Sequence, residues 1–218
     1  MAPNPSDGRR LPVYLLLDCS TSMTGEPIAA IEMGLCALLD DLRNDPQALE
    51  TVWLSVITFA SGADVVVELT PVEDFQPPEL SAYGVTALGE AIRLLGDRIA
   101  EEVRVTGPNR KGDWKPLVFV LTDGEPTDDW QSAVDDFRLR GQATVVACGA
   151  GSAINEETLR RLGDTVVRLK DARPGTLGAF MRWVSSSVTT ASQVLGARAA
   201  AGPRLPEPPE GGGIQIVL

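Results

Sequence analysis

Apolar residues along this chain occur in two kinds of run that alternate from one end to the other. One kind is a short continuous stretch, as at residues 13–17 and 117–121, which is typical of parallel strands covered on both faces. The other kind repeats at helical spacing and would line one face of a helix. The clearest example comprises Ile28, Ile31, Leu35, Leu38 and Leu42. The alternation predicts an α/β fold with a doubly wound, mainly parallel central sheet and helices on both faces.

Turn-forming residues and changes of periodicity set the expected boundaries of these elements. The predicted strands cover residues 12–18, 51–59, 63–69, 117–122, 144–149 and 166–169. The predicted helices cover residues 27–44, 87–105, 130–140, 155–162 and 176–189. Residues 60–62 are too short a connection for a parallel crossover, so they predict a hairpin that gives the sheet one antiparallel edge strand.

The ends of the chain differ in composition from its middle. We expect one domain over residues 10–190, preceded by a flexible segment at 1–9. Residues 191–218 are rich in Ala, Pro and Gly, which bury too little apolar area to offset the entropy of ordering, so they predict a flexible tail. Residues 214–218 are apolar and favour a strand, and the alternative is that they add to a sheet edge.

Polar side chains gather where the predicted strands end. An Asp-x-Ser-x-Ser motif follows the first strand, a Thr precedes the helix at 87–105, and an Asp follows the strand at 117–122. In an open α/β sheet, the loops at the carboxyl ends of the strands form the binding crevice. Hydroxyl and carboxylate oxygens suit a hard divalent cation, and Mg²⁺ takes about six of them. The candidate metal ligands are Asp18, Ser20, Ser22, Thr86 and Asp123.

These three motifs together resemble the metal-ion-dependent adhesion site of the von Willebrand factor A (VWA) family, which has a Rossmann-like fold. The resemblance implies that the hydroxyls of Ser20, Ser22 and Thr86 coordinate Mg²⁺ directly, while Asp18 and Asp123 act mostly through bound water. It also implies an open coordination position that a Glu or Asp carboxylate of a protein partner fills. Mn²⁺ and Ca²⁺ are the alternative ions.

Longer segments resemble a narrower group, the bacterial TerY-type proteins of tellurium-resistance and chemical-stress systems. This resemblance implies a metal-dependent interaction module that works with a protein kinase and a protein phosphatase of the same system. The expected role is a scaffold or adaptor in stress response or phospho-signalling. The segments are residues 11–14, 25–28, 49–52, 111–114, 122–130 and 180–185.

Charge and composition exclude several classes of partner. The net charge of −11 disfavours nucleic acid and anionic lipid, both of which need a basic surface. No apolar run is long enough to span a bilayer, and the first ten residues lack the apolar core of a secretory signal. The three cysteines cannot pair completely, so we expect a cytoplasmic protein without a disulfide framework. Cys19, beside the candidate metal ligands, is either a reactive thiol or a small residue that fills a turn.

Catalysis is not expected, because the chain contains no histidine and no nucleophile-elbow, Walker A or dinucleotide-binding motif. Two alternatives from other classes stay open. One is an accessory subunit of an AAA+ ATPase, as other intracellular VWA proteins are. The other is a metal-dependent phosphohydrolase with two metal ions. Its carboxylates would be Asp18, Asp123, Glu125, Asp128 and Asp129.

Overall fold

The computed structural model describes residues 8–108, 110–197, 205–209 and 211–217, which contain one seven-stranded sheet. The strands are β1 (Leu11–Asp18), β2 (Val52–Phe59), β3 (Ala63–Pro71), β4 (Leu117–Thr122), β5 (Thr144–Ala150), β6 (Thr165–Leu169) and β7 (Ile214–Val217). The helices are η2 (Thr21–Met23, a 3-10 helix), α1 (Glu26–Asn44), α2 (Pro46–Thr51), α3 (Leu88–Glu102), α4 (Trp130–Arg140), α5 (Glu156–Leu162) and α6 (Pro174–Ala197).

The strands follow the order β3-β2-β1-β4-β5-β6-β7 across the sheet. Strands β2, β1, β4, β5 and β6 run parallel to one another. The predicted hairpin is present, because β3 pairs with β2 in the antiparallel sense. The mainly parallel α/β fold is therefore confirmed. One detail differs from the expected single antiparallel edge, since β7 pairs antiparallel with β6 and forms a second one. This pairing agrees with the alternative that residues 214–218 add to a sheet edge.

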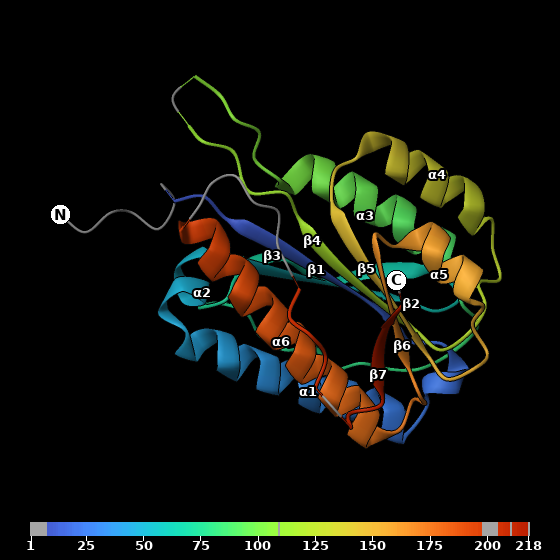
Figure 1. Ribbon diagram of the computed structural model, residues 1–218. Helices are drawn as coiled ribbons and strands as arrows, with labels where there is room; N and C mark the ends of the chain where they lie inside the picture. Colours follow the sequence, from blue (N-terminus) through green and yellow to red (C-terminus); the bar gives the residue numbers. More distant parts are fainter. Residues whose placement is uncertain (1–7, 109, 198–204, 210, 218) are drawn as a thin grey trace.

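Helices cover both faces of the sheet and create two apolar cores (Figure 1). Helices α1, α2 and α6 pack on one face, and α3, α4 and α5 on the other. Strand β1 is buried along its whole length, and its alternate residues enter different cores. Leu15 and Leu17 belong to the first core, whereas Tyr14 and Leu16 belong to the second. The continuous apolar runs of the sequence arise from this burial on both faces.

The sequence reasoning missed two short helices, η2 and α2. Helix α2 begins after Asp45, whose carboxylate accepts a hydrogen bond from Ala48 N at 2.7 Å, and Pro46 occupies its first turn. Both are ordinary helix-start signals. The six residues of α2 are too few to show a helical repeat of apolar positions, so periodicity alone does not reveal it.

Two described segments after residue 190 form regular structure that their composition does not indicate. Helix α6 continues to Ala197, and the carbonyl of Pro206 accepts a hydrogen bond from Trp183 Nε1 at 2.9 Å. Ile214 and Ile216 pack against the first core from β7. Of the segments predicted to be flexible, residues 1–7, 198–204, 210 and 218 lie outside the described residues.

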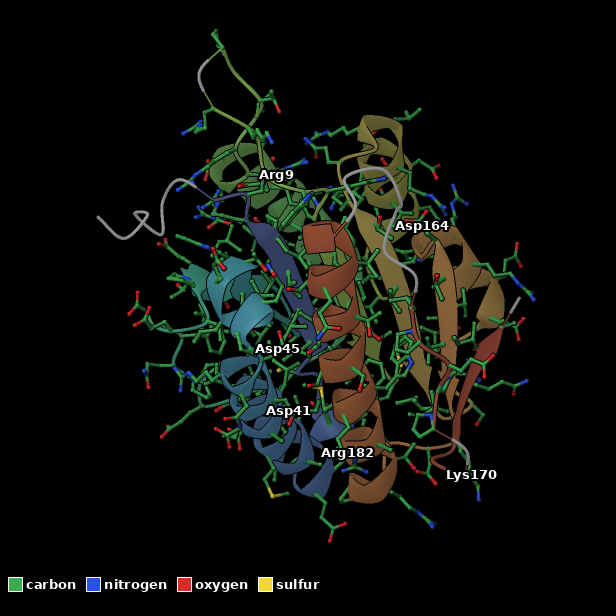
Figure 2. The ribbon with its side chains drawn as sticks, turned by 60° about the vertical axis from the view of Figure 1, so that its left-hand side comes forward. Arg9, Asp41, Asp45, Asp164, Lys170 and Arg182 are labelled. Atoms are coloured by element: carbon green, nitrogen blue, oxygen red, sulfur yellow. The ribbon has the colours of Figure 1, made fainter. Side chains whose placement is uncertain are left out.

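Polar contacts join α6 to the adjacent helices on this face. Figure 2 shows Asp41 and Asp45 beside α6. The carboxylate of Asp41 accepts a hydrogen bond from Ser185 Oγ at 2.7 Å, and that of Asp45 accepts one from Gln193 Nε2 at 2.9 Å. Across the described part of the chain, no helix combines the length and the apolar character needed to cross a bilayer.

Candidate metal centre

The carboxylate of Asp18 lies at the end of β1, where the loops that follow β1 and β4 meet. Leu17 pairs with Leu121 across these two strands, so Asp18 and Thr122 are neighbours in the sheet. Asp18 is fully buried, and both of its oxygens accept hydrogen bonds. Ser20 N donates to Oδ1 at 2.8 Å, and Thr122 Oγ1 donates to Oδ2 at 2.6 Å. The carboxylate is therefore held in one orientation beneath the loop.

Two hydroxyls and a second carboxylate form a series of contacts that leads from Asp18 towards solvent. Ser20 Oγ and Ser22 Oγ lie 3.0 Å apart, and Ser22 Oγ donates to Asp123 Oδ1 at 2.6 Å. Ser20 is buried, whereas Ser22 is exposed. The structure thus connects four of the five predicted ligands through hydrogen bonds, with the polar atoms ending at the surface where a partner could reach them.

The loop before α3 is attached to the Asp-x-Ser-x-Ser loop by backbone contacts. Tyr83 N donates to the carbonyl of Cys19 at 2.8 Å. The carbonyl of Gly84 accepts from Thr21 twice, from its backbone N at 3.2 Å and its Oγ1 at 2.8 Å. Gly84 has a φ of 68°, a left-handed conformation that glycine adopts without steric cost. These contacts fix the backbone of Tyr83 and Gly84, which lie just before Thr86 in the chain.

Thr86, the fifth predicted ligand, lies against the loop that follows β4. Its carbonyl accepts a hydrogen bond from Thr127 N at 2.9 Å. A Cβ placed on Gly124 would come within 3.4 Å of Thr86 Oγ1, so this hydroxyl faces the residue directly after Asp123. All five predicted residues therefore gather at one end of the sheet, at the carboxyl ends of β1 and β4.

Electrostatics at this position favour a bound cation. Burial raises the pKa of Asp18, and the negative charge of Asp123 adds to that shift, while hydrogen bonds from Ser20 and Thr122 oppose it. Among the described residues, no ion pair involves either of these two carboxylates. A divalent cation would supply the missing positive charge.

The types of side chain present also fit a hard cation. No cluster of three or more His, Cys, Asp or Glu side chains suited to a metal occurs in the part of the chain that the structure describes. The centre instead combines two carboxylates with the hydroxyls of Ser20, Ser22 and Thr86, an all-oxygen set. Oxygen ligands of this kind suit Mg²⁺, Mn²⁺ or Ca²⁺.

Asp128, one of the carboxylates considered for a phosphohydrolase, instead binds the backbone at the start of α3. Its two oxygens accept hydrogen bonds from Gly89 N at 3.0 Å and Glu90 N at 2.9 Å, in the first turn of α3. This contact satisfies backbone donors that the helix itself leaves free. Asp128 therefore joins the loop after β4 to the start of α3, and so supports the position of Thr86.

Glu125 and Asp129 are also engaged away from the centre. The carboxylate of Glu125 accepts hydrogen bonds from Asn155 N and from Thr158 Oγ1, the latter at 3.3 Å. Asp129 lies 3.6 Å from a guanidinium nitrogen of Arg93 in an exposed ion pair. A two-metal arrangement of carboxylates is therefore not assembled around Asp18.

Cys19 lies in the Asp-x-Ser-x-Ser loop but is buried, with 2% of its surface exposed. Burial, together with the neighbouring carboxylates of Asp18 and Glu32, raises the pKa of its thiol to about 12. The reactive form of cysteine is the thiolate, which this environment disfavours. Of the two interpretations, a small residue that fills the turn fits the structure.

Thr122 is the residue of the centre to which the sequence analysis gave no role of its own. It directly precedes Asp123, and the sequence places it as the last residue of an apolar strand. Its hydroxyl orients Asp18, and this contact depends on the pairing of β1 with β4.

The fold and the centre together define an α/β domain that carries a candidate cation site of oxygen ligands at the ends of its parallel strands. The sequence model of the von Willebrand factor type A domain matches residues 13–173, more than half of the chain. The chain therefore belongs to the VWA family, as its motifs indicated.

Similar proteins were found in curated sequences and among solved structures. "Uncharacterized protein sll0103" of Synechocystis sp. is 33% identical over 124 residues, which are 54% of this chain and 26% of that protein. A von Willebrand factor type A structure from Catenulispora acidiphila aligns with a TM-score of 0.64 and 22% identity, over 84% of this chain and 43% of the other. The chain thus spans about a quarter of its curated relative and less than half of this solved chain.

A third similar protein has a metal in the corresponding motif. It is proximal thread matrix protein 1 from the mussel byssus, in a structure with a zinc-occupied metal-ion-dependent adhesion site. The alignment has a TM-score of 0.59 and 17% identity, over 82% of this chain and 48% of the other. At such identities the two solved structures show that the fold is shared.

Proposed function

We propose that this protein is a Mg²⁺-dependent protein-binding module without catalysis of its own. The observation that carries the proposal is the continuous set of contacts from buried Asp18 through Ser20 and Ser22 to Asp123, with Thr86 beside it. Ser20, Ser22 and Thr86 would hold the ion through their hydroxyls, and the two carboxylates would orient those hydroxyls and bound water. When bound, the ion supplies a positive centre with a position open to a partner's Glu or Asp carboxylate.

The residues of the candidate centre would each contribute differently to holding the ion and receiving a partner. Thr122 fixes Asp18, so that its negative charge stays directly behind the serines. Asp123 holds the exposed Ser22 hydroxyl in place before a partner arrives. Pre-ordering of this kind reduces the entropy that binding would otherwise cost. The carboxylates of Glu125, Asp128 and Asp129 form other contacts, which supports a binding role over a two-metal hydrolase.

The biological setting is the finer part of the proposal. The segments similar to TerY-type proteins support a scaffold or adaptor in a bacterial stress or phospho-signalling system, with a protein kinase and a protein phosphatase as candidate partners. The free cysteines at 19, 36 and 148 accord with a reducing, cytoplasmic setting. Neither an AAA+ ATPase nor phosphate hydrolysis is favoured by a specific contact in the described residues.

The proposal is tested by affinity capture from extract of the native cells, with the tagged full chain in excess Mg²⁺ or in a chelator. The double variant Ser20→Ala, Asp123→Ala removes a ligand and a supporting carboxylate. The matched control is Ser132→Ala, Asp136→Ala, which changes the same residue types on the exposed surface of α4. Partners captured only with Mg²⁺, and by the control but not the site variant, are expected. Equal capture in the chelator would refute the metal-dependent mechanism.

A further inference from the structure

Two exposed apolar side chains flank Gly84 in the loop that leads to Thr86. Tyr83 and Val85 are each 51% exposed, and no other pair of exposed large apolar residues in the described chain is as close in sequence. Scattered single residues of this kind are normal on protein surfaces and need no explanation, whereas an adjacent pair beside a candidate site does. The scattered ones are Met33, Leu49, Val66, Val105 and Leu139.

The backbone that carries these two side chains is fixed on several sides. Tyr83 N donates to the carbonyl of Cys19, and Gly84 is held by Thr21 as described above. A Cβ on Gly84 would come within 2.0 Å of Ser61 Oγ, so the loop also lies directly against the β2–β3 turn. The exposure of Tyr83 and Val85 therefore belongs to an ordered surface, and binding there would not require the loop to be ordered first.

The pair also lies next to a proposed ligand of the cation along the chain. Val85 precedes Thr86, one of the proposed ligands, and consecutive Cα atoms are about 3.8 Å apart. A partner segment in extended conformation advances about 3.3 Å per residue. A side chain one or two positions away from an acid bound at the cation would therefore reach this loop.

We infer that Tyr83 and Val85 form an apolar contact surface that selects, among acidic partner segments, those with a hydrophobic side chain within two residues of the metal-bound acid. This inference rests on the proposed function and names the class of partner: a protein segment with a Glu or Asp next to an apolar residue. An acid alone is common on protein surfaces, so the cation by itself would discriminate poorly. Burial of an apolar side chain against an aromatic residue supplies the missing selectivity. A second copy of this chain is disfavoured as the partner, since two molecules of charge −11 repel.

The test uses a displayed library of short random peptides with a fixed central Asp or Glu, selected on the immobilised full chain in Mg²⁺ or in a chelator. The intact protein should enrich, only in Mg²⁺, peptides with an apolar residue within two positions of the acid. The variant Tyr83→Ser, Val85→Ser should bind an enriched peptide roughly tenfold more weakly and lose the apolar preference. The control Leu139→Ser removes an apolar side chain that is 86% exposed on α4, and should change nothing.

The outcomes separate this inference from the function on which it rests. Mg²⁺-dependent enrichment without an apolar preference, or with one that survives in the serine variant, overturns the inference and leaves the metal-dependent module intact. Enrichment that needs Tyr83 and Val85 but not Mg²⁺ refutes the metal-dependent function and the role of the acid. No enrichment at all contradicts both. Both side chains are half-exposed, so their replacement should leave thermal unfolding unchanged, which circular dichroism would verify.

Discussion

The hydroxyl of Thr122 lies 2.6 Å from Asp18 Oδ2, and this contact links the ends of two adjacent parallel strands. Asp18 is fully buried, so an oxygen without this donor would be left without a hydrogen-bond partner in the protein. The contact therefore serves the fold and the candidate metal centre together: it joins β1 to β4 and orients the carboxylate behind the serines.

Replacement of Thr122 by Val, which is similar in shape but has no hydroxyl, tests this contact. We expect the free energy of unfolding to fall by about 1–3 kcal/mol, the usual cost of leaving a buried polar group unsatisfied. We also expect the stabilisation by added Mg²⁺ to shrink, because Asp18 is no longer held in place. Urea unfolding with and without Mg²⁺ measures both. Thr122→Ser keeps the hydroxyl and is the control; equal loss in Val and Ser variants would contradict a role for the hydrogen bond.

Thiol chemistry should distinguish the three cysteines. Cys36 is exposed, whereas Cys19 and Cys148 are buried and burial raises the pKa of both thiols. We expect a thiol-specific reagent to modify one cysteine rapidly in the native protein and three after denaturation. The variant Cys36→Ser should abolish the rapid reaction. Rapid modification of Cys19 in that variant would mean that the Asp-x-Ser-x-Ser loop opens far more readily than the structure implies.

The fold and the site differ in how much of each was predictable from sequence. Continuous apolar runs identify β1 and β4 because parallel strands bury both faces, and the same position in the fold brings Asp18 and Asp123 together. These inferences need only local pattern and one topological rule. They sufficed to group Asp18, Ser20, Ser22 and Asp123 at one end of the sheet, whereas Thr86 was joined to them by the resemblance to the VWA family.

Other features depend on tertiary contacts that local pattern does not contain. Strand β7 has four residues after a glycine-rich segment, and it is ordered by pairing with β6 and by burial of Ile214 and Ile216. The roles of Thr122 and Asp128 follow from which residues lie opposite them. A threonine at a strand end and an aspartate in a loop are common, so neither stands out before the strands are aligned.

Asp171 should make stability depend on pH at the start of α6. Hydrogen bonds from Thr176 Oγ1 at 2.7 Å and from Arg173 N at 3.1 Å hold the pKa of Asp171 below its ordinary value. A lowered pKa means that the folded state prefers the ionised form. This stabilisation is present above the pKa of the unfolded chain, about 4, and is lost as the pH falls through the lower folded value.

We therefore expect Asp171→Ala to be less stable than the natural protein at neutral pH, with the difference shrinking under acid conditions. Urea unfolding at neutral pH and near pH 3 measures it. The control is Asp136→Ala on α4, where the aspartate is exposed. A difference for Asp171→Ala that stays constant with pH would show that the carboxylate's charge contributes nothing there.

The ion pair between Arg10 and Asp113 lies at the opposite end of the sheet from the candidate metal centre and should matter for stability alone. Arg10 Nη2 and Asp113 Oδ2 are 2.5 Å apart, and the side chains of Arg10 and Asp113 are 8% and 1% exposed, respectively. Asp113 also accepts a hydrogen bond from Arg104 N at 2.8 Å, and the guanidinium of Arg10 lies over the ring of Trp53. The pair thus connects the start of β1 to the loop before β4.

Removal of one partner leaves the other charge buried, which typically costs about 3–5 kcal/mol. We expect a loss of that size for Asp113→Ala in urea unfolding, with Mg²⁺-dependent capture retained below the unfolding transition. The double variant Arg10→Met, Asp113→Leu should recover part of the loss, because it leaves no unpaired buried charge. If the double variant is as unstable as the two single changes combined, the cost arises from lost packing and hydrogen bonds at this end of the sheet, and an unpaired charge is not its cause.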